Sequence, residues 1–120
     1  MNPIFVYGIL RGRTNAQRAT VSGYSLIDMG PFPAAIEDEE RDCILGELIY
    51  VHDAERQAFD MVEGHPYFYV RTTVEVEIED GGEVVTAEMY VLRSMHVPSP
   101  VRMDRVTTTP STQRTYYEYR

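Results

Sequence analysis

An acidic residue ends the one segment of this sequence with clear helical periodicity. The stretch FDMVEGHPYFYVR, residues 59–71, places Glu63 directly before Gly64, and Pro66 follows two residues later. Glycine suits the position after a helix and proline forbids continuation, so we expect the helix to end at Glu63. The macrodipole makes that end negative and disfavours a carboxylate there by about 0.3–1 kcal/mol. Glu63 is therefore a candidate functional group.

The surroundings of Glu63 indicate which chemistry it could do. Val62 precedes it and the tyrosine-rich run PYFY, residues 66–69, follows it, so its charged form should be poorly solvated. Poor solvation raises a carboxyl pKa toward the range in which one group can both accept and donate a proton. The alternative is a solvated acid at a frayed helix end, and the neighbouring motifs favour the functional interpretation.

A second candidate group lies where the first predicted strand ends. IFVYG, residues 4–8, is a short apolar run of strand-forming residues that stops at Gly8. Backbone N–H groups exposed at a glycine turn can form a small cradle for an anion. The Tyr7-Gly8 turn is therefore a candidate site for a carboxylate.

The elements that must position these groups are mostly strands. Six are predicted, at residues 4–8, 24–30, 33–38, 42–52, 70–79 and 84–92. Residues 13–20 are expected to hold a helical turn or two. Asp53 should cap a helix over residues 54–62, with a buried stripe formed by Ala54, Ala58, Met61 and Val62. This pattern indicates an α+β domain built on a mixed, mostly antiparallel, barrel-like sheet with one main helix.

The expected domain covers residues 1–96. The remaining residues, 97–120, lose periodicity and are mostly polar, but the last five contain three tyrosines. This C-terminal tail is expected either to be mobile or to dock through its aromatic rings. The turn GPFP, residues 30–33, and the tail are candidates for the outer wall of a pocket.

Composition argues against several classes of function. Eleven basic and nineteen acidic residues give a net charge of −8, which disfavours nucleic acid and anionic membrane surfaces. No apolar run has the length of a membrane span, and MNPIFVYG does not resemble a signal peptide, so a cytoplasmic protein is expected. The single cysteine, Cys43, is expected in the core. The three histidines have no metal-ligand spacing, so neither metal nor cofactor is expected.

Five pieces of the sequence carry a resemblance to a known family. In chain order they are FVYGIL, GPFPAAI, ILGELIYV, FDMVEGHPYFYVRTTVEV and AEMYVL, from Ile4 to Leu92. In this order, with a helix that ends in Glu-Gly before a Tyr-x-Arg strand, they resemble the gamma-glutamylcyclotransferase-like superfamily. The likeness is to its small members, the gamma-glutamylamine cyclotransferases and AIG2-like proteins.

The resemblance implies an enzyme that needs no cofactor or metal. Its substrate would be a small gamma-glutamyl amine, whose alpha-amine attacks its own gamma-carbonyl to release 5-oxoproline and a free amine. Glu63 matches the family's general acid/base. The positions that match the family's substrate-binding residues are Tyr7, Gly8, Ile9, Leu10, Tyr69 and Tyr90.

One position departs from the family pattern. The family's loop usually has serine or threonine after Tyr-Gly, whereas this sequence has Ile9. The alternative function is therefore a non-catalytic module on the same fold that binds a small molecule or a peptide. The excess of acidic residues suggests an acidic pocket rim, which would favour a cationic leaving amine. The oligomeric state is left open.

Overall fold

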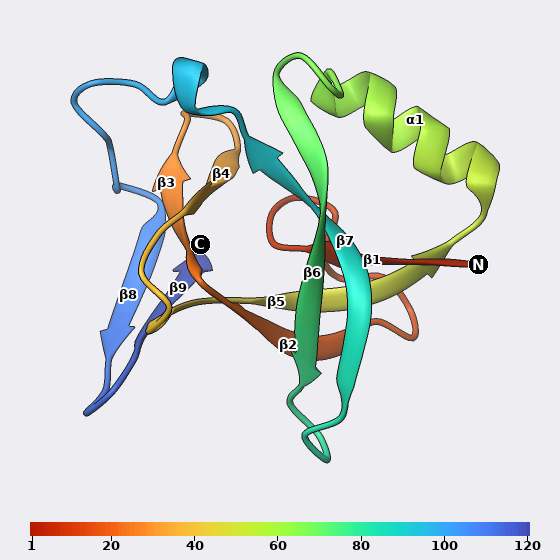
Figure 1. Cartoon of the computed structure of the whole chain (residues 1–120), viewed down its shortest axis with the longest axis horizontal. Coiled ribbons are helices and arrows are strands. Elements are labelled where there is room, and N and C mark those ends of the chain that lie inside the picture. Colours follow the sequence, from red (N-terminus) through yellow and green to blue (C-terminus); the bar gives the residue numbers. More distant parts are fainter.

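Nine β-strands and one α-helix make up the structure, a computed structural model that describes residues 1–120 (Figure 1). In chain order the elements are β1 (Asn2–Val6), β2 (Gln17–Ser22), β3 (Tyr24–Asp28), β4 (Pro33–Glu37), β5 (Asp42–Val51), α1 (Asp53–Glu63), β6 (Tyr69–Ile78), β7 (Val84–Leu92), the short 3-10 helix η1 (Ser94–His96), β8 (Val106–Pro110) and β9 (Thr115–Tyr119).

Five of the strands close into a ring. β1 pairs antiparallel with β5 and parallel with β7; β7 pairs with β6, β6 with β2, and β2 with β5. The β3–β4 hairpin extends the sheet from β7, and the β8–β9 hairpin extends it from β5. Three pairings are parallel and the others antiparallel. The predicted fold class, a mixed, mostly antiparallel barrel-like sheet with one main helix, is confirmed.

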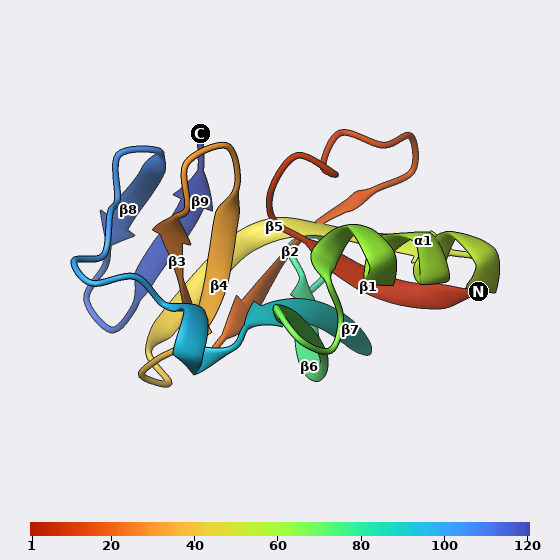
Figure 2. The same ribbon diagram turned by 90° about the horizontal axis from the view of Figure 1, so that it is seen from above.

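Alternation along the strands creates two apolar clusters. The larger cluster fills the barrel and draws on all five ring strands, with Phe5, Val21, Leu48, Val76 and Met89 among its members. The smaller cluster lies mainly on the outer face of β1, β5 and β7, and it includes Phe59 of α1. Figure 2 shows α1 on the same side as β1. Successive side chains of a strand point to opposite faces. β1 therefore contributes to both clusters.

The prediction of a helical turn at residues 13–20 is wrong, because β2 begins at Gln17. Ala19 and Val21 point into the barrel, while the side chains between and after them are more exposed. Two apolar positions are too few for a strand pattern to be visible in the sequence. Pairing with both β5 and β6 is what fixes this segment as a strand.

Two predictions about α1 are also wrong, although its end at Glu63 is confirmed. His52, not Asp53, is the N-cap residue, and the Asp53 carboxylate accepts a hydrogen bond of 2.7 Å from Asn2. The predicted buried stripe is exposed: the exposed fractions of Met61 and Val62 are 83% and 82%. The residue that the helix buries is Phe59. The helix is therefore rotated relative to the prediction and leaves its apolar C-terminal residues uncovered.

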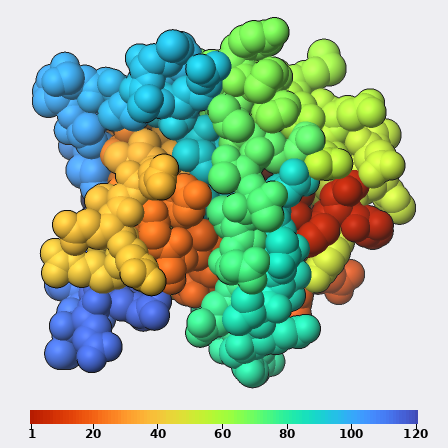
Figure 3. All heavy atoms as spheres, in the orientation of Figure 1, coloured from red at the N-terminus to blue at the C-terminus, as the bar shows by residue number.

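The C-terminal residues form a hairpin on the sheet. β9 runs parallel to β5 over three residue pairs, and the Thr115 N–H donates to the Arg41 carbonyl at 3.2 Å. The space-filling view shows these residues beside the turn before β5 (Figure 3). Tyr119 is buried and completes one end of the larger cluster. Neither helix of the chain has the length and apolar character needed to cross a membrane.

The close approach of β1 and β5 leads to a first prediction. A Cβ atom at Gly46 would lie 2.5 Å from the Val6 carbonyl oxygen and 2.7 Å from the Phe5 ring. Gly46→Ala should therefore lower the free energy of unfolding by about 1–3 kcal/mol, the usual effect of overpacking. Urea denaturation measures this change. Unchanged stability would show that the barrel does not need glycine here.

Candidate active site

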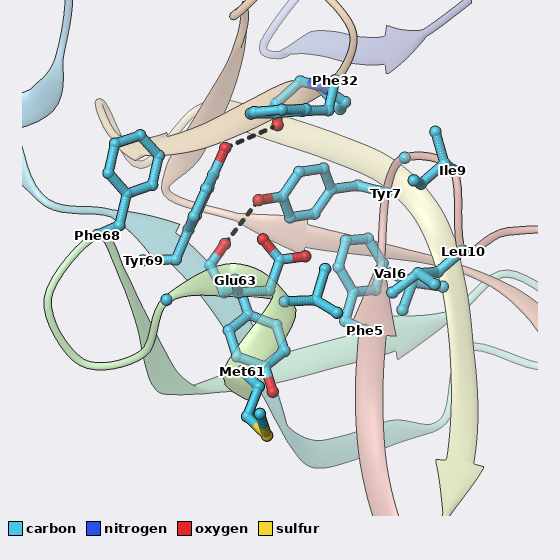
Figure 4. A pocket seen from close by; sticks show the side chains of 15 residues that line it. Phe5, Val6, Tyr7, Ile9, Leu10, Phe32, Met61, Glu63, Phe68 and Tyr69 are labelled. Carbon is cyan, nitrogen blue, oxygen red and sulfur yellow. Dashed lines mark hydrogen bonds between the residues drawn. The ribbon is translucent and has the colours of Figure 1, made fainter. Parts of the chain in front are cut away.

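A cavity of about 360 Å³ lies where the end of β1, the turn before β4 and the C-terminus of α1 meet (Figure 4). The structure brings together every site residue predicted from the sequence: Tyr7, Gly8, Ile9, Leu10, Glu63, Tyr69 and Tyr90 all line this cavity. They come from segments up to 83 residues apart. The predicted residues therefore share one pocket, while their roles stay predictions.

Glu63 reaches the cavity because of the way α1 ends. Gly64 adopts the left-handed conformation, with φ of 68°, and the N–H groups of Gly64 and His65 donate to the carbonyls of Met61 and Asp60. This cap turns the chain away at the last helical residue. Figure 4 shows the Glu63 carboxylate inside the cavity, near the Tyr7 side chain. Burial raises the pKa of Glu63 above its ordinary value.

The turn after β1 lines the same cavity and carries unpaired backbone donors. The N–H groups of Gly8, Ile9 and Leu10 donate no hydrogen bond within the protein. The turn itself is held by its neighbours: Arg11 donates to the Gly8 carbonyl at 3.1 Å, and Glu47 accepts from the Gly12 N–H at 2.6 Å. A fixed turn with unpaired N–H groups suits a carboxylate ligand.

The C-terminal hairpin supports this turn without lining the cavity. Arg11 donates through Nη2 to the Tyr119 carbonyl at 2.7 Å, in addition to its bond with Gly8. The expectation that GPFP contributes to the pocket wall is confirmed by Phe32 and Pro33, but no residue of the tail lines the cavity. The contribution of the tail is therefore indirect.

Three tyrosines form much of the wall, and the protein orients each hydroxyl. Tyr7 donates to the Tyr90 carbonyl at 2.7 Å and accepts from the Ala35 N–H at 3.2 Å. Tyr69 donates to the Pro33 carbonyl at 3.2 Å. Burial raises the pKa of Tyr7, Tyr69 and Tyr90, so the hydroxyls stay neutral. These side chains provide a rigid, uncharged wall.

A network of charges ties α1 to the barrel just beside the pocket. Asp60 accepts hydrogen bonds from Arg71 and, at 2.6 Å, from Tyr90. Glu88 of β7 lies 2.9 Å from Arg71 of β6 and 2.7 Å from Arg56 of α1. The helix is therefore linked to the strands through both Asp60 and Arg56. Burial by itself would raise the Asp60 pKa, but the bonds from Tyr90 and Arg71 lower it overall. Asp60 is therefore an ionised anchor.

Sequence reasoning did not assign several apolar lining residues. They are Phe5, Val6, Met61, Val62 and Phe68. The Phe68 and Tyr69 rings meet edge to face with centroids 5.2 Å apart, so adjacent residues in the run PYFY share the wall. Met61 and Val62 were assigned to the core because helical spacing reveals a common face but not what that face contacts.

The predicted acidic rim is not present. Glu63 is the one carboxylate that lines the cavity, and no basic side chain lines it. The acids of β6, Glu75 and Glu77, lie on the exposed face of that strand. No group of three or more histidine, cysteine, aspartate or glutamate side chains is arranged to hold a metal ion.

A closed five-stranded barrel with one helix, whose end carries a partly buried carboxylate into a small cavity, defines the class of protein. The sequence profile described as "Gamma-glutamyl cyclotransferase, AIG2-like" matches residues 4–109. The chain therefore belongs to the gamma-glutamyl cyclotransferase, AIG2-like family, as its motifs indicated.

Individual relatives agree with this assignment. A curated protein of Methanocaldococcus jannaschii, named "Putative gamma-glutamylcyclotransferase", is 27% identical over 95 residues, covering 70% of this chain and 79% of its own. A solution structure from Arabidopsis thaliana has a TM-score of 0.70 at 24% identity and covers 81% of this chain and 72% of its own. An AIG2-like protein of Mus musculus has a TM-score of 0.67 at 24% identity, with coverage of 82% and 80%. The two structures establish a shared fold.

The environment of Glu63 predicts an unusual effect on stability. Because its pKa is raised in the folded protein, ionisation is less favourable there than in the unfolded chain. Glu63→Gln should therefore raise the melting temperature above the folded-state pKa. The gain should vanish as the pH falls below 4.5, the ordinary value for glutamate.

Glu55 on the same helix is a matched control. Its hydrogen bond with Arg13 lowers its pKa, so Glu55→Gln should lower the melting temperature at neutral pH. Thermal unfolding of both variants from pH 3 to 8 measures the difference. A destabilised Glu63→Gln at pH 7 would show that the carboxylate has an unrecognised stabilising partner.

Proposed function

We propose that this protein converts a gamma-glutamyl amine to 5-oxoproline and a free amine, with Glu63 as general acid and base. The observation that carries the proposal is the position of Glu63 inside a small cavity, where burial raises its pKa. The same cavity is lined by a turn with three unpaired N–H groups. Membership of the family supports the same reaction class. A carboxylate of this kind is suited to accepting a proton and returning it.

The reaction asks little of a protein beyond position and proton transfer. The attacking alpha-amine is tethered to the gamma-carbonyl that it attacks, and holding such a pair in reactive geometry can supply about 7–11 kcal/mol. A cavity with neutral, fixed walls favours the folded-back substrate over extended forms. The unpaired N–H groups of Gly8, Ile9 and Leu10 would bind its alpha-carboxylate.

The proton balance assigns two steps to one carboxylate. Glu63 takes a proton from the alpha-ammonium, and the freed amine forms a bond to the gamma-carbon. The amide bond then breaks as Glu63 returns the proton to the leaving nitrogen. The new lactam keeps one hydrogen on its nitrogen, so the ammonium loses two protons: one reaches the leaving amine through Glu63, and the other goes to solvent.

The tyrosines have a supporting role in this proposal. Their hydroxyls already donate hydrogen bonds to acceptors within the protein. Their raised pKa values also make them poor proton carriers near neutral pH. They exclude water from Glu63 and keep its pKa raised. Asp60 and Arg71 hold the helix end that carries Glu63, and they are positioning residues.

Turnover tests the proposal directly. Purified protein is incubated with a panel of gamma-glutamyl amines and gamma-glutamyl amino acids, and 5-oxoproline is measured by mass spectrometry. Glu63→Gln should lower the rate by about 10²-fold or more, because it removes the proton carrier and keeps the shape. Glu55→Gln, on the same helix but outside the cavity, should retain the rate.

The same experiment separates this function from its alternative. A non-catalytic binding module would show thermal stabilisation by gamma-glutamyl ligands without 5-oxoproline, and that stabilisation would persist in Glu63→Gln. Equal turnover in the wild type and Glu63→Gln would contradict the assignment of Glu63.

The pH dependence of kcat/KM provides an independent check. Glu63 must begin as a carboxylate, so activity should fall as acid protonates it. Because burial raises its pKa, the midpoint of this acidic limb should lie above pH 4.5. Initial rates from pH 4 to 8 at subsaturating substrate measure it. A midpoint at or below 4.5 would show that Glu63 is solvated during the reaction.

A further inference from the structure

The cavity offers a substrate one charged side chain and a mostly apolar wall. Eleven of its 15 lining residues are hydrophobic, and Glu63 is the one side chain among them that is charged near neutral pH. Its volume of about 360 Å³ lies near the lower end for small-molecule sites. A bound ligand is therefore small and contacts mainly carbon atoms.

Exposed apolar side chains gather on this wall. Ile9, Met61 and Val62 are all highly exposed although they line the cavity, and Phe32 is 37% exposed. They come from the turn after β1, the turn before β4 and the end of α1, so they border the cavity from three directions. Large exposed apolar side chains are ordinary when scattered, but several around one cavity indicate a surface that an apolar ligand covers.

The protein groups that can bind the charged alpha-amine and alpha-carboxylate of the substrate are already assigned in the proposed reaction. In the proposed reaction Glu63 faces the alpha-ammonium, and the N–H groups of the Gly8–Leu10 turn face the alpha-carboxylate. No second carboxylate lines the cavity to pair with a positive charge on the leaving amine. A cation placed against Met61 and Val62 would therefore find no carboxylate partner among the lining residues, whereas an alkyl chain would cover their exposed apolar surface.

We propose that the amine portion of the substrate is an alkyl or arylalkyl group without a charged substituent, whose carbon chain packs on Ile9, Met61, Val62 and Phe32. This inference rests on the proposed function and specifies its substrate class. The net charge of −8 does not oppose it, because Glu63 is the only one of the nineteen acidic residues that lines the cavity.

A series of gamma-glutamyl n-alkylamides tests the inference. Ethyl, propyl, butyl and pentyl amides are compared by kcat/KM for 5-oxoproline release. The butylamide is also compared with the amide of 1,3-diaminopropane, which replaces its terminal methyl group by an ammonium of similar size. Each methylene that stays on the wall should raise kcat/KM about three- to fivefold, and the butylamide should exceed its cationic partner by about tenfold or more.

Two matched variants locate the effect. Val62→Thr keeps the shape of an exposed side chain but adds a hydroxyl, so it should lower the advantage of the butylamide over the cationic amide by about two- to fivefold. Val84, at the β6–β7 hairpin, is exposed and lies outside this cavity, so Val84→Thr should leave that advantage unchanged.

The outcomes distinguish this inference from the function on which it rests. Release of 5-oxoproline with equal or faster turnover of the cationic amide, or without dependence on chain length, overturns the inference and leaves the reaction standing. Absence of 5-oxoproline from every amide overturns the proposed function. In that case calorimetric binding of the butylamide and its cationic partner decides the inference, and equal or weaker binding of the butylamide overturns it.

Discussion

The pairing of β1 with strands on both of its sides is the constraint on which the site depends. β1 binds β5 antiparallel and meets β7 in a parallel bridge between Ile4 and Glu88, which closes the ring of five strands. Its Phe5 side chain fills the barrel over Gly46, while its neighbours face α1. A strand held on both edges cannot shift in register without exposing its apolar residues. The turn that follows β1 therefore starts from a fixed position.

The second part of the site is positioned by charge. Asp60 and Glu63 lie one turn apart on α1, yet their surroundings shift their pKa values in opposite directions. Asp60 gains Arg71 and Tyr90 as partners and stays ionised, so it can anchor the helix. Glu63 is partly buried without such partners, so its pKa is raised and it binds a proton more readily than a solvated glutamate. The surroundings therefore separate the pKa values of two carboxyl groups on one helix.

The C-terminal hairpin stabilises the site from outside the cavity. Its strand β9 adds to β5, and the Tyr119 carbonyl accepts a hydrogen bond from Arg11, the residue next to the turn with free N–H groups. Glu47 on β5 accepts a hydrogen bond from the N–H of Gly12, the residue after Arg11, and so holds the same side of the turn. A segment with no periodicity in its sequence thus becomes part of the frame, because strand addition depends on backbone hydrogen bonds and not on an apolar pattern.

Local chemistry in the sequence determined much of this protein. The alternation in β6, the glycine turn after Tyr7 and the Glu-Gly end of α1 each depend on neighbouring residues, and the structure has all three. The tertiary structure alone decided that Gln17–Ser22 is a strand, and that Met61 and Val62 border a cavity instead of filling a core. Periodicity shows which residues share a face, but whether that face is covered depends on distant segments. Here Phe59 and the Asp60 network set the rotation of α1, and Met61 and Val62 are left bordering the cavity.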